Sequence, residues 1–287
     1  MRWNDFRRSE NVEDAGSGGG FGGGFKIGGG ALLAIVVISL LLGKNPLDVL
    51  ALLETTAPPT VQVPAGAPPR VPAQNDPQVD FVRAILGDTE DFWSAELARR
   101  GGRYQPPKLT LFHGQVASAC GFASAAMGPF YCAGDERVYL DLRFFQELSQ
   151  RFGAPGDFAR AYVIAHEVGH HVQNQLGLMR EVQQTAENAS DRARNALSVR
   201  QELQADCFAG VWGHSAQQRG ALDTRDVEQG IAAASAVGDD RLQQRSRGYA
   251  VPESFMHGSS AQRVKWFRIG LSSGDLRQCN TFAAAGL

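Results

Sequence analysis

The sequence predicts a mostly helical α+β domain with a small sheet, preceded by a single transmembrane helix. Apolar residues at helical spacing over 158–172 indicate a buried helix, and short apolar runs at 109–112 and 138–142 indicate strands. A third apolar run, over 27–43, is separated from the rest by proline-rich sequence. With 287 residues and 43% hydrophobic content, the chain can bury a sizeable core.

The formal net charge of −2 gives no electrostatic footprint for nucleic acid, so we expect no nucleic-acid partner. The chain contains no internal repeat and no phosphate-binding glycine loop. Partners must therefore be inferred from local sites.

Residues 1–26 are polar and then glycine-rich, a composition that cannot pack, so we expect a disordered tail there. Residues 27–43 are apolar apart from glycines and Ser39, and they reach the lower limit of about 17 residues for a spanning helix. A signal-peptide core and a buried helix are the alternatives. No small-x-small cleavage site follows at usable distance, and polar or proline-rich sequence flanks the run. We therefore predict a transmembrane anchor over 27–43.

The charges beside this run predict its orientation. More basic residues precede it than follow it, so the N-terminus is expected in the cytoplasm and the following domain in the periplasm or outside. Residues 44–75 are proline-rich and are expected to form a semi-extended linker. The sequence thus predicts a single-pass protein of the inner (cytoplasmic) membrane with its folded domain over 76–287. The basic residues are Arg2, Arg7, Arg8 and Lys26 before the run, and Lys44 and Arg70 after it.

Inside the domain, residue patterns predict the order of the elements before the buried helix. Helices are expected at 79–86 and 90–98, strands at 109–112 and 138–142, and a further helix at 142–152.

The buried helix contains the motif His-Glu-x-x-His, from His166 to His170. Residues four apart lie one turn above each other on a helix, so both imidazoles can bind one ion. Glu167 lies beside them and could take a proton from a water at the metal, as in a zinc peptidase. The alternative is a buried helix with two structural histidines, because a five-residue motif is short.

The flanking residues support a helix around this motif. Gly156 and Asp157 can begin it, and Gly177 can end it. Gly169 is unusual, because glycine inside a helix costs about 1 kcal/mol relative to alanine. We predict that another backbone segment passes close to Gly169.

A third protein ligand is needed, and Glu202 is the best candidate. Asp206 follows it by one helical turn and could accept a hydrogen bond from a ligating imidazole. The alternative is that both carboxylates belong to a solvated helix face. The upstream motif and the apolar neighbours favour the ligand interpretation; these neighbours are Leu203, Phe208, Val211 and Trp212.

The other histidines are expected to be structural. His171 points about 100° away from His170 around the helix, so it packs or meets solvent. His214 follows the Glu202 helix and could approach the site from the side, and His113 ends a strand-like run.

All four cysteines follow the predicted anchor, which fits an oxidising compartment. Cys120 and Cys132 flank a short glycine-containing loop and are expected to pair, which leaves Cys207 to pair with Cys279. Three pairings can be formed from four cysteines, and free thiols are the alternative if the topology is inverted. A cysteine zinc site is disfavoured, because no Cys-x-x-Cys spacing occurs.

A longer set of segments is spread through nearly the whole chain: Arg2-Trp3, Asn11 to Asp14, Met127 to Cys132, Tyr162 to His171, Glu202 to His214, Gly238 to Gln243 and Gln278 to Phe282. In these segments the chain resembles the bacterial neutral zinc metallopeptidases. The resemblance implies a membrane-anchored, zincin-like peptidase of gluzincin type with Zn²⁺ as cofactor. Gluzincins have a small sheet beside the active-site helix, and its edge strand pairs with an extended substrate. That edge is expected within 128–142.

A weaker resemblance concerns Phe255 to Arg263. This segment is similar to membrane-associated gluzincins of the CAAX-protease and heat-shock-protease type, which carry a histidine followed by an arginine after the glutamate-ligand helix. In those relatives the histidine donates to the substrate oxyanion, which implies this role for His257. Ser259 and Gln262 form a capping-box pattern, so the alternative is that His257 belongs only to the loop leading into a helix.

Together these residues predict a zinc metallopeptidase that cleaves envelope proteins or peptides. Zn²⁺ held by His166, His170 and Glu202 would polarise the scissile carbonyl, and Glu167 would transfer the water proton to the leaving amine. The alternatives are a membrane-anchored zinc protein that binds extended peptides without cutting them and an envelope scaffold without metal. Glu167 disfavours the first alternative, because a structural site usually has four protein ligands and needs no such carboxylate.

Overall fold

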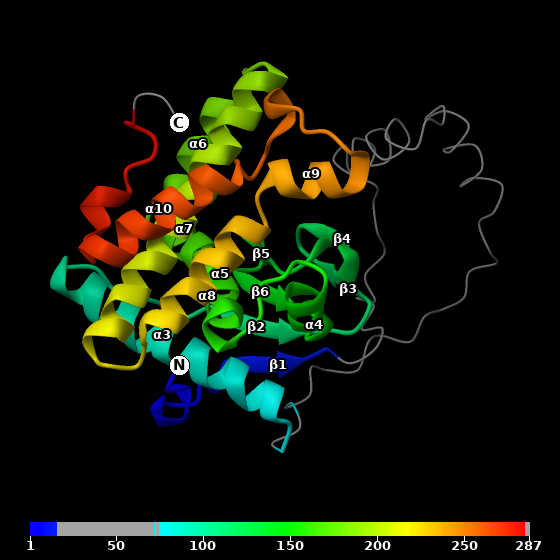
Figure 1. Cartoon of the computed structure of the whole chain (residues 1–287). Coiled ribbons are helices and arrows are strands. Elements are labelled where there is room, and N and C mark those ends of the chain that lie inside the picture. Colours follow the sequence, from blue (N-terminus) through cyan, green and yellow to red (C-terminus); the bar gives the residue numbers. More distant parts are fainter. Residues whose placement is uncertain (16–71, 73–74, 285–287) are drawn as a thin grey trace, which may run out of the picture.

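The computed structural model describes residues 1–15, 72 and 75–284, and this part is mostly helical with a small sheet, as predicted (Figure 1). The helices are α3 (Pro77–Arg99), α4 (Arg143–Gln150), α5 (Asp157–Gln175), α6 (Leu178–Ala186), α7 (Asp191–Gln218), α8 (Thr224–Ala236), α9 (Asp239–Arg247) and α10 (Ser260–Ser273). The strands are β1 (Val12–Asp14), β2 (Lys108–Leu111), β3 (Gln115–Ser118), β4 (Gly121–Ser124), β5 (Phe130–Cys132) and β6 (Arg137–Leu140). Short 3₁₀ turns are η1 (Trp3–Asp5), η2 (Ala125–Met127), η3 (Pro252–Ser254) and η4 (Leu276–Cys279).

The main sheet has the strand order β1-β2-β6-β5, and β3 pairs with β4 in a separate hairpin. Strands β1, β2 and β6 are parallel, whereas β5 runs antiparallel to β6 at one edge. The predicted strands at 109–112 and 138–142 correspond to β2 and β6. The edge strand expected within 128–142 is β5, which contacts the buried helix α5.

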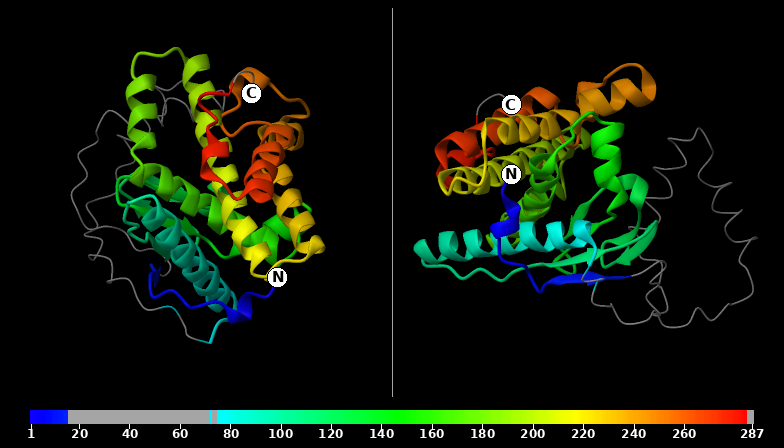
Figure 2. Two further views of the ribbon diagram at one scale, coloured as in Figure 1. Left: turned by 90° about the vertical axis from the view of Figure 1, so that its left-hand side faces the viewer. Right: turned by 60° about the horizontal axis from the view of Figure 1, so that its bottom comes forward.

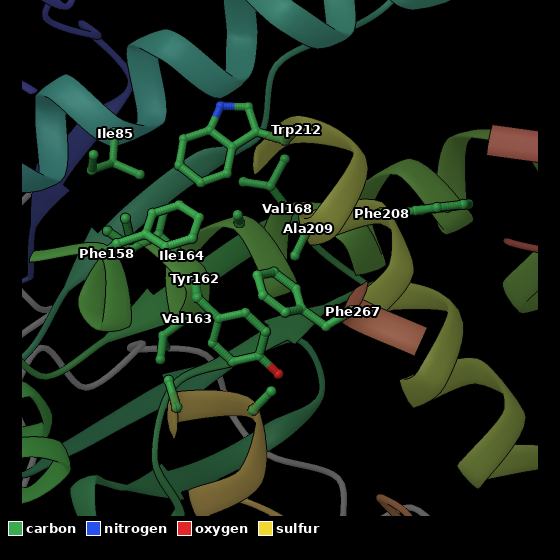
Figure 3. Packing of buried hydrophobic residues seen from close by; sticks show 14 of the residues in the cluster. Ile85, Phe158, Tyr162, Val163, Ile164, Val168, Phe208, Ala209, Trp212 and Phe267 are labelled. Carbon is green, nitrogen blue, oxygen red and sulfur yellow. The ribbon is translucent and has the colours of Figure 1, made fainter. Parts of the chain in front are cut away.

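Helices α5, α7, α8 and α10 pack against one another and contain much of the core (Figures 1 and 2). Figure 3 shows aromatic side chains from three of them meeting in its centre. Phe158 of α5 stacks on Trp212 of α7, with ring centroids 5.9 Å apart. Tyr162 of α5 meets Phe267 of α10 edge to face at 5.2 Å. Such contacts fix the relative positions of the three helices that carry the candidate site.

The first fifteen residues belong to the folded domain, so the prediction of a disordered tail is wrong for them. Val12 to Asp14 form β1, which pairs in parallel with β2. The indole Nε1 of Trp3 donates to Asp157 at 3.0 Å, at the start of α5. The glycine-rich sequence begins only after this segment. The prediction averaged composition over residues 1–26, and such an average does not detect a strand of three residues.

A second difference between the predicted and the observed structure concerns the helix α3. Two helices were expected, at 79–86 and 90–98, but α3 is one helix from Pro77 to Arg99 that includes Gly87. A Cβ on Gly87 would lie 2.3 Å from the carbonyl oxygen of Arg7 and 3.0 Å from the amide nitrogen of Ser9. Glycine is therefore needed because the N-terminal segment crosses the helix at this point.

Within the described residues, no helix is long and apolar enough to cross a membrane. The predicted anchor at 27–43 and most of the predicted linker at 44–75 lie outside the described residues. Because β1 and β2 share one sheet, residues 1–15 and the domain must lie on the same side of any membrane. This arrangement contradicts the predicted topology, in which they lie on opposite sides.

A chain shortened to residues 76–287 is expected to be strongly destabilised. The buried carboxylate of Glu90 accepts hydrogen bonds from Arg7 and Ser9, both at 2.6 Å, and from Asn11 at 2.8 Å. Removing all three donors leaves a buried charge unpaired, which costs about 3–5 kcal/mol. Urea unfolding of the full and shortened chains in one detergent measures the loss. Glu90→Gln should recover part of it in the shortened chain; equal midpoints for the full and shortened chains would refute the account.

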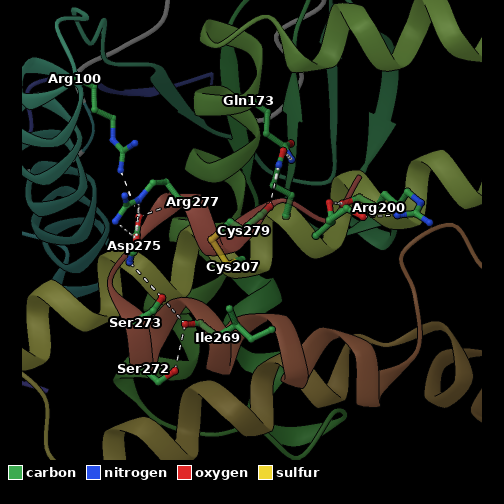
Figure 4. Close-up of a disulfide and its surroundings, with 12 residues drawn as sticks. Arg100, Gln173, Arg200, Cys207, Ile269, Ser272, Ser273, Asp275, Arg277 and Cys279 are labelled. Atoms are coloured by element: carbon green, nitrogen blue, oxygen red, sulfur yellow. Dashed lines mark hydrogen bonds and ion pairs between the residues drawn. A yellow bond between two sulfur atoms is a disulfide. The ribbon is translucent and has the colours of Figure 1, made fainter. Parts of the chain in front are cut away.

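Both predicted disulfides are confirmed: Cys120 pairs with Cys132, and Cys207 with Cys279. The first joins the turn between β3 and β4 to β5. The second ties η4 to α7 one residue after Asp206, as Figure 4 shows. The C-terminal segment is therefore held on the helix that carries Glu202.

Candidate metal centre

The helix α5 presents His166 and His170 on one buried face, with ring centroids 4.7 Å apart. The helix α7 crosses α5 at Gly169, where a Cβ would lie 3.0 Å from the carbonyl oxygen of Ala205. The predicted close backbone is therefore α7. Because the two helices approach so closely, Glu202 on α7 faces both histidines.

The three predicted ligands lie together. His166 Nε2 is 3.1 Å from Glu202 Oε2, and His170 Nε2 is 3.3 Å from Glu202 Oε1. The candidate ligand atoms all lie within 4.8 Å of one another. Two imidazole nitrogens and one carboxylate are a donor set that zinc accepts, and three protein ligands leave a fourth position for water or substrate. The residues therefore fit a catalytic zinc site.

Asp206 lies against the imidazole of His166. His166 Nδ1 pairs with Asp206 Oδ1 at 2.9 Å, and its Nε2 faces Glu202. Burial lowers the pKa of His166, but the Asp206 carboxylate outweighs this effect and raises the pKa to about 10. A carboxylate in this position increases the basicity of a metal-binding imidazole.

Arg263 of α10 neutralises Asp206, and sequence reasoning gave it no role. Its Nε donates to Asp206 Oδ2 at 2.8 Å and its Nη2 to Oδ1 at 2.9 Å. Tyr162 of α5 donates to the same carboxylate. Although burial raises the pKa of Asp206, Arg263 and His166 hold it below the ordinary value. Arg263 can reach Asp206 because α10 and α7 meet backbone to backbone at Gly270, where a Cβ would lie 2.0 Å from the Cys207 carbonyl oxygen.

Glu167 is 7% exposed and lies next to His166 on α5. Burial raises the pKa of its carboxyl above the ordinary value, whereas the two imidazoles lower it. A carboxyl with a raised pKa is a better proton acceptor than an exposed one, which suits a general base.

His257 lies in the loop between η3 and α10, and Asp239 orients it. Its Nδ1 donates to Asp239 Oδ1 at 3.0 Å, and its backbone N–H donates to Oδ2 at 2.6 Å. The hydrogen bond to Asp239 and the charge of Glu202 raise the pKa of His257, although burial lowers it. The capping box of Ser259 and Gln262 is also present, so His257 does belong to the loop that leads into α10.

The remaining predicted histidines stay outside the cluster of possible ligands among the described residues. His171 Nε2 donates to the Gln105 carbonyl oxygen at 2.7 Å, and its Nδ1 lies 3.1 Å from the Tyr131 hydroxyl. His214 Nδ1 donates to the Leu271 carbonyl oxygen at 2.9 Å. Both histidines are structural, as expected.

A His-Glu-x-x-His helix facing a glutamate on a second helix offers the donor set of a catalytic zinc site in metallopeptidases. The family model described as "Putative neutral zinc metallopeptidase" matches residues 1–282, and the chain belongs to this family.

Relatives are found in several bacteria. The uncharacterized protein YpfJ of Escherichia coli (strain K12) is 47% identical over 288 residues, which cover 98% of this chain and 99% of the relative. The uncharacterized protein Rv2575 of Mycobacterium tuberculosis (strain H37Rv) is 48% identical over 195 residues, which cover 64% of this chain and 65% of the relative. No solved structure matches significantly.

Proposed function

We propose that the protein is a zinc-dependent endopeptidase that hydrolyses peptide bonds in proteins or peptides. The observation that carries this proposal is the buried carboxylate of Glu167 beside the donor set of His166, His170 and Glu202. When bound there, zinc would polarise the scissile carbonyl and lower the pKa of a water molecule. A purely structural zinc site would need a fourth protein ligand and no neighbouring base.

The chain's own residues supply the proton transfers. Glu167 takes the proton from the attacking water and then delivers it to the leaving amine. His257, held by Asp239, donates a hydrogen bond to the carbonyl oxygen as negative charge develops there, an interaction worth a few kcal/mol of barrier.

The edge strand β5 supports an extended polypeptide as substrate. An extended chain can add to an exposed sheet edge through main-chain hydrogen bonds, which recognise little of its sequence. The β5 strand ends the sheet and contacts α5, so a peptide paired with it would run beside the metal-binding helix.

The two disulfides support an extracytoplasmic location and thus a substrate among envelope proteins. A single span at 27–43 would place residues 1–15 and the domain on opposite sides of the membrane, so attachment through this run is not part of the proposal. With residues 1–15 in the same folded unit as the domain, an extracytoplasmic domain requires these residues to be extracytoplasmic too.

Glu202→Gln is expected to remove zinc and hydrolysis together. Wild-type protein should bind about one zinc ion per chain and cleave casein. Losing a residue that only orients a ligand lowers zinc affinity roughly 10–100-fold, and losing the ligand itself in this variant should lower the affinity further. Glu228→Gln, an exposed change on α8, is the matched control. Zinc analysis and casein cleavage check both results. Zinc binding without cleavage in the wild type would favour the non-catalytic peptide-binding alternative, and absence of zinc would refute the metal site.

A further inference from the structure

His170 is the second predicted zinc ligand. Its Nδ1 contacts a neutral amide, whereas Nδ1 of His166 contacts the carboxylate of Asp206. His170 Nδ1 lies 2.9 Å from Oε1 of Gln173, an uncharged amide on the same helix. Gln173 is completely buried, and Gln204 of α7, which it contacts, is 5% exposed. Burying an amide group costs free energy unless hydrogen bonds satisfy its polar atoms, so the hydrogen bonds of these two side chains matter.

The two glutamines continue the contact away from the metal centre. Gln173 Nε2 donates to the Gln201 carbonyl oxygen at 2.8 Å and to Gln204 Oε1 at 3.0 Å. Gln204 Nε2 then donates to the Cys279 carbonyl oxygen at 3.1 Å. Figure 4 shows Gln173 directed toward the segment that carries Cys279. A row of hydrogen bonds thus runs from His170 to the disulfide-bonded C-terminal segment.

The backbone carbonyls set the direction of every hydrogen bond in this row. A carbonyl oxygen only accepts, so the Gln204 amide must turn its nitrogen toward Cys279 and its oxygen toward Gln173. Gln173 must likewise present its nitrogen to Gln201 and Gln204, which leaves its oxygen facing His170. That oxygen cannot donate, so His170 Nδ1 carries the proton and Nε2 is left with the lone pair that binds a metal.

The far end of the row is fixed at two points. Cys279 is disulfide-bonded to Cys207 of α7 and fully buried. Two residues later, the Thr281 hydroxyl donates to the Arg200 carbonyl oxygen at 2.6 Å, and the Arg200 side chain donates to the Thr281 carbonyl oxygen. The accepting carbonyl of Cys279 is therefore held in position against α7.

We propose that Gln173, Gln204 and the Cys279 carbonyl form a relay that fixes the tautomer and ring orientation of His170 for zinc binding. Gln173 and Gln204 are positioning residues, because Gln173 contacts Nδ1 of His170 and Gln204 acts through Gln173. The proposal rests on the proposed zinc site. It gives the C-terminal segment a function beyond stability: its disulfide holds the acceptor that orients a metal ligand on another helix.

The test measures zinc affinity by competition with a chelator, using the full chain and three variants. Gln173→Met removes both ends of the amide, and its zinc dissociation constant should rise about 10–100-fold. Gln204→Met should weaken binding by a smaller factor of up to about 10-fold. Gln217→Met, at an exposed position of α7, is the control and should match the wild type.

One result would overturn the relay while leaving the zinc site standing, namely wild-type affinity in both Gln173→Met and Gln204→Met. A wild type that binds no zinc would instead refute the proposed function and the relay with it.

A measurement on unmutated protein covers the case in which a variant does not fold. In ¹⁵N-histidine spectra of the zinc-loaded wild type, His170 should carry its proton on Nδ1 and bind zinc through Nε2. A proton on Nε2 of His170 would contradict the relay.

Discussion

Glu167→Gln should lower the rate of peptide hydrolysis by about 100- to 10,000-fold and leave zinc binding unchanged, because general base catalysis contributes a factor of this size. Glu167 is buried beside His166 but is not among the three residues whose ligand atoms cluster. Glutamine has nearly the same shape and cannot accept the water proton. Burial already raises the pKa of this carboxyl, so replacing it by a neutral amide should not destabilise the fold.

The measurement is kcat/KM on casein together with zinc content and melting temperature. Glu181→Gln, at an exposed position of α6, should behave like the wild type in all three. Retained hydrolysis in Glu167→Gln would refute its assignment as the base. Loss of zinc in the same variant would mean that Glu167 supports the metal and not the proton transfer.

Arg263→Met should destabilise the protein by about 3–5 kcal/mol, because it leaves the carboxylate of Asp206 buried without its cation. Asp206 is 0% exposed, and Arg263, which is 4% exposed, binds both of its oxygens. Zinc affinity should also fall, since a displaced Asp206 no longer orients His166. The free energy of unfolding in urea and the zinc dissociation constant measure the two effects.

The double variant Asp206→Asn/Arg263→Met separates the charge from the packing. Removing both charges should recover part of the unfolding free energy but none of the zinc affinity, because asparagine is a weaker acceptor for His166 than a carboxylate. Arg268→Met, an exposed change on the same helix, should have no effect. Unchanged stability in Arg263→Met would contradict the buried ion pair.

The shared face of His166 and His170 could be predicted from sequence because its geometry is local. Helical spacing alone places His166 and His170 on one face, and the same spacing links Glu202 to Asp206. Gly169 even predicted the close approach of a second backbone, since an interior glycine is costly unless something occupies the space of its Cβ.

Roles for Arg263 and Gln204 could not be predicted, because both residues make contacts that are distant in sequence. Arg263 lies 57 residues after Asp206, and Gln204 lies 31 residues after Gln173. In a helical sequence, a polar residue among apolar ones looks the same whether it faces solvent or a buried partner. Only the packing of α10 and α7 distinguishes the two.

The N-terminal segment was missed for a related reason. A three-residue strand has almost no signal of its own, and β1 gains its stability from pairing with β2 almost a hundred residues away. Gly87 of α3 lies where this segment crosses the helix. Its role is to let the backbone of Arg7 to Ser9 cross α3.

The central claim is that this chain uses zinc and Glu167 to add water to a peptide bond. The most direct test incubates the zinc-loaded full chain with casein in oxygen-18 water and analyses the products by mass spectrometry. We predict fragments with oxygen-18 at their new carboxyl ends, which disappear with a chelator, return with added zinc and are nearly absent with Glu167→Gln. Absence of fragments from the zinc-loaded wild type, or equal fragments from Glu167→Gln, would contradict the claim.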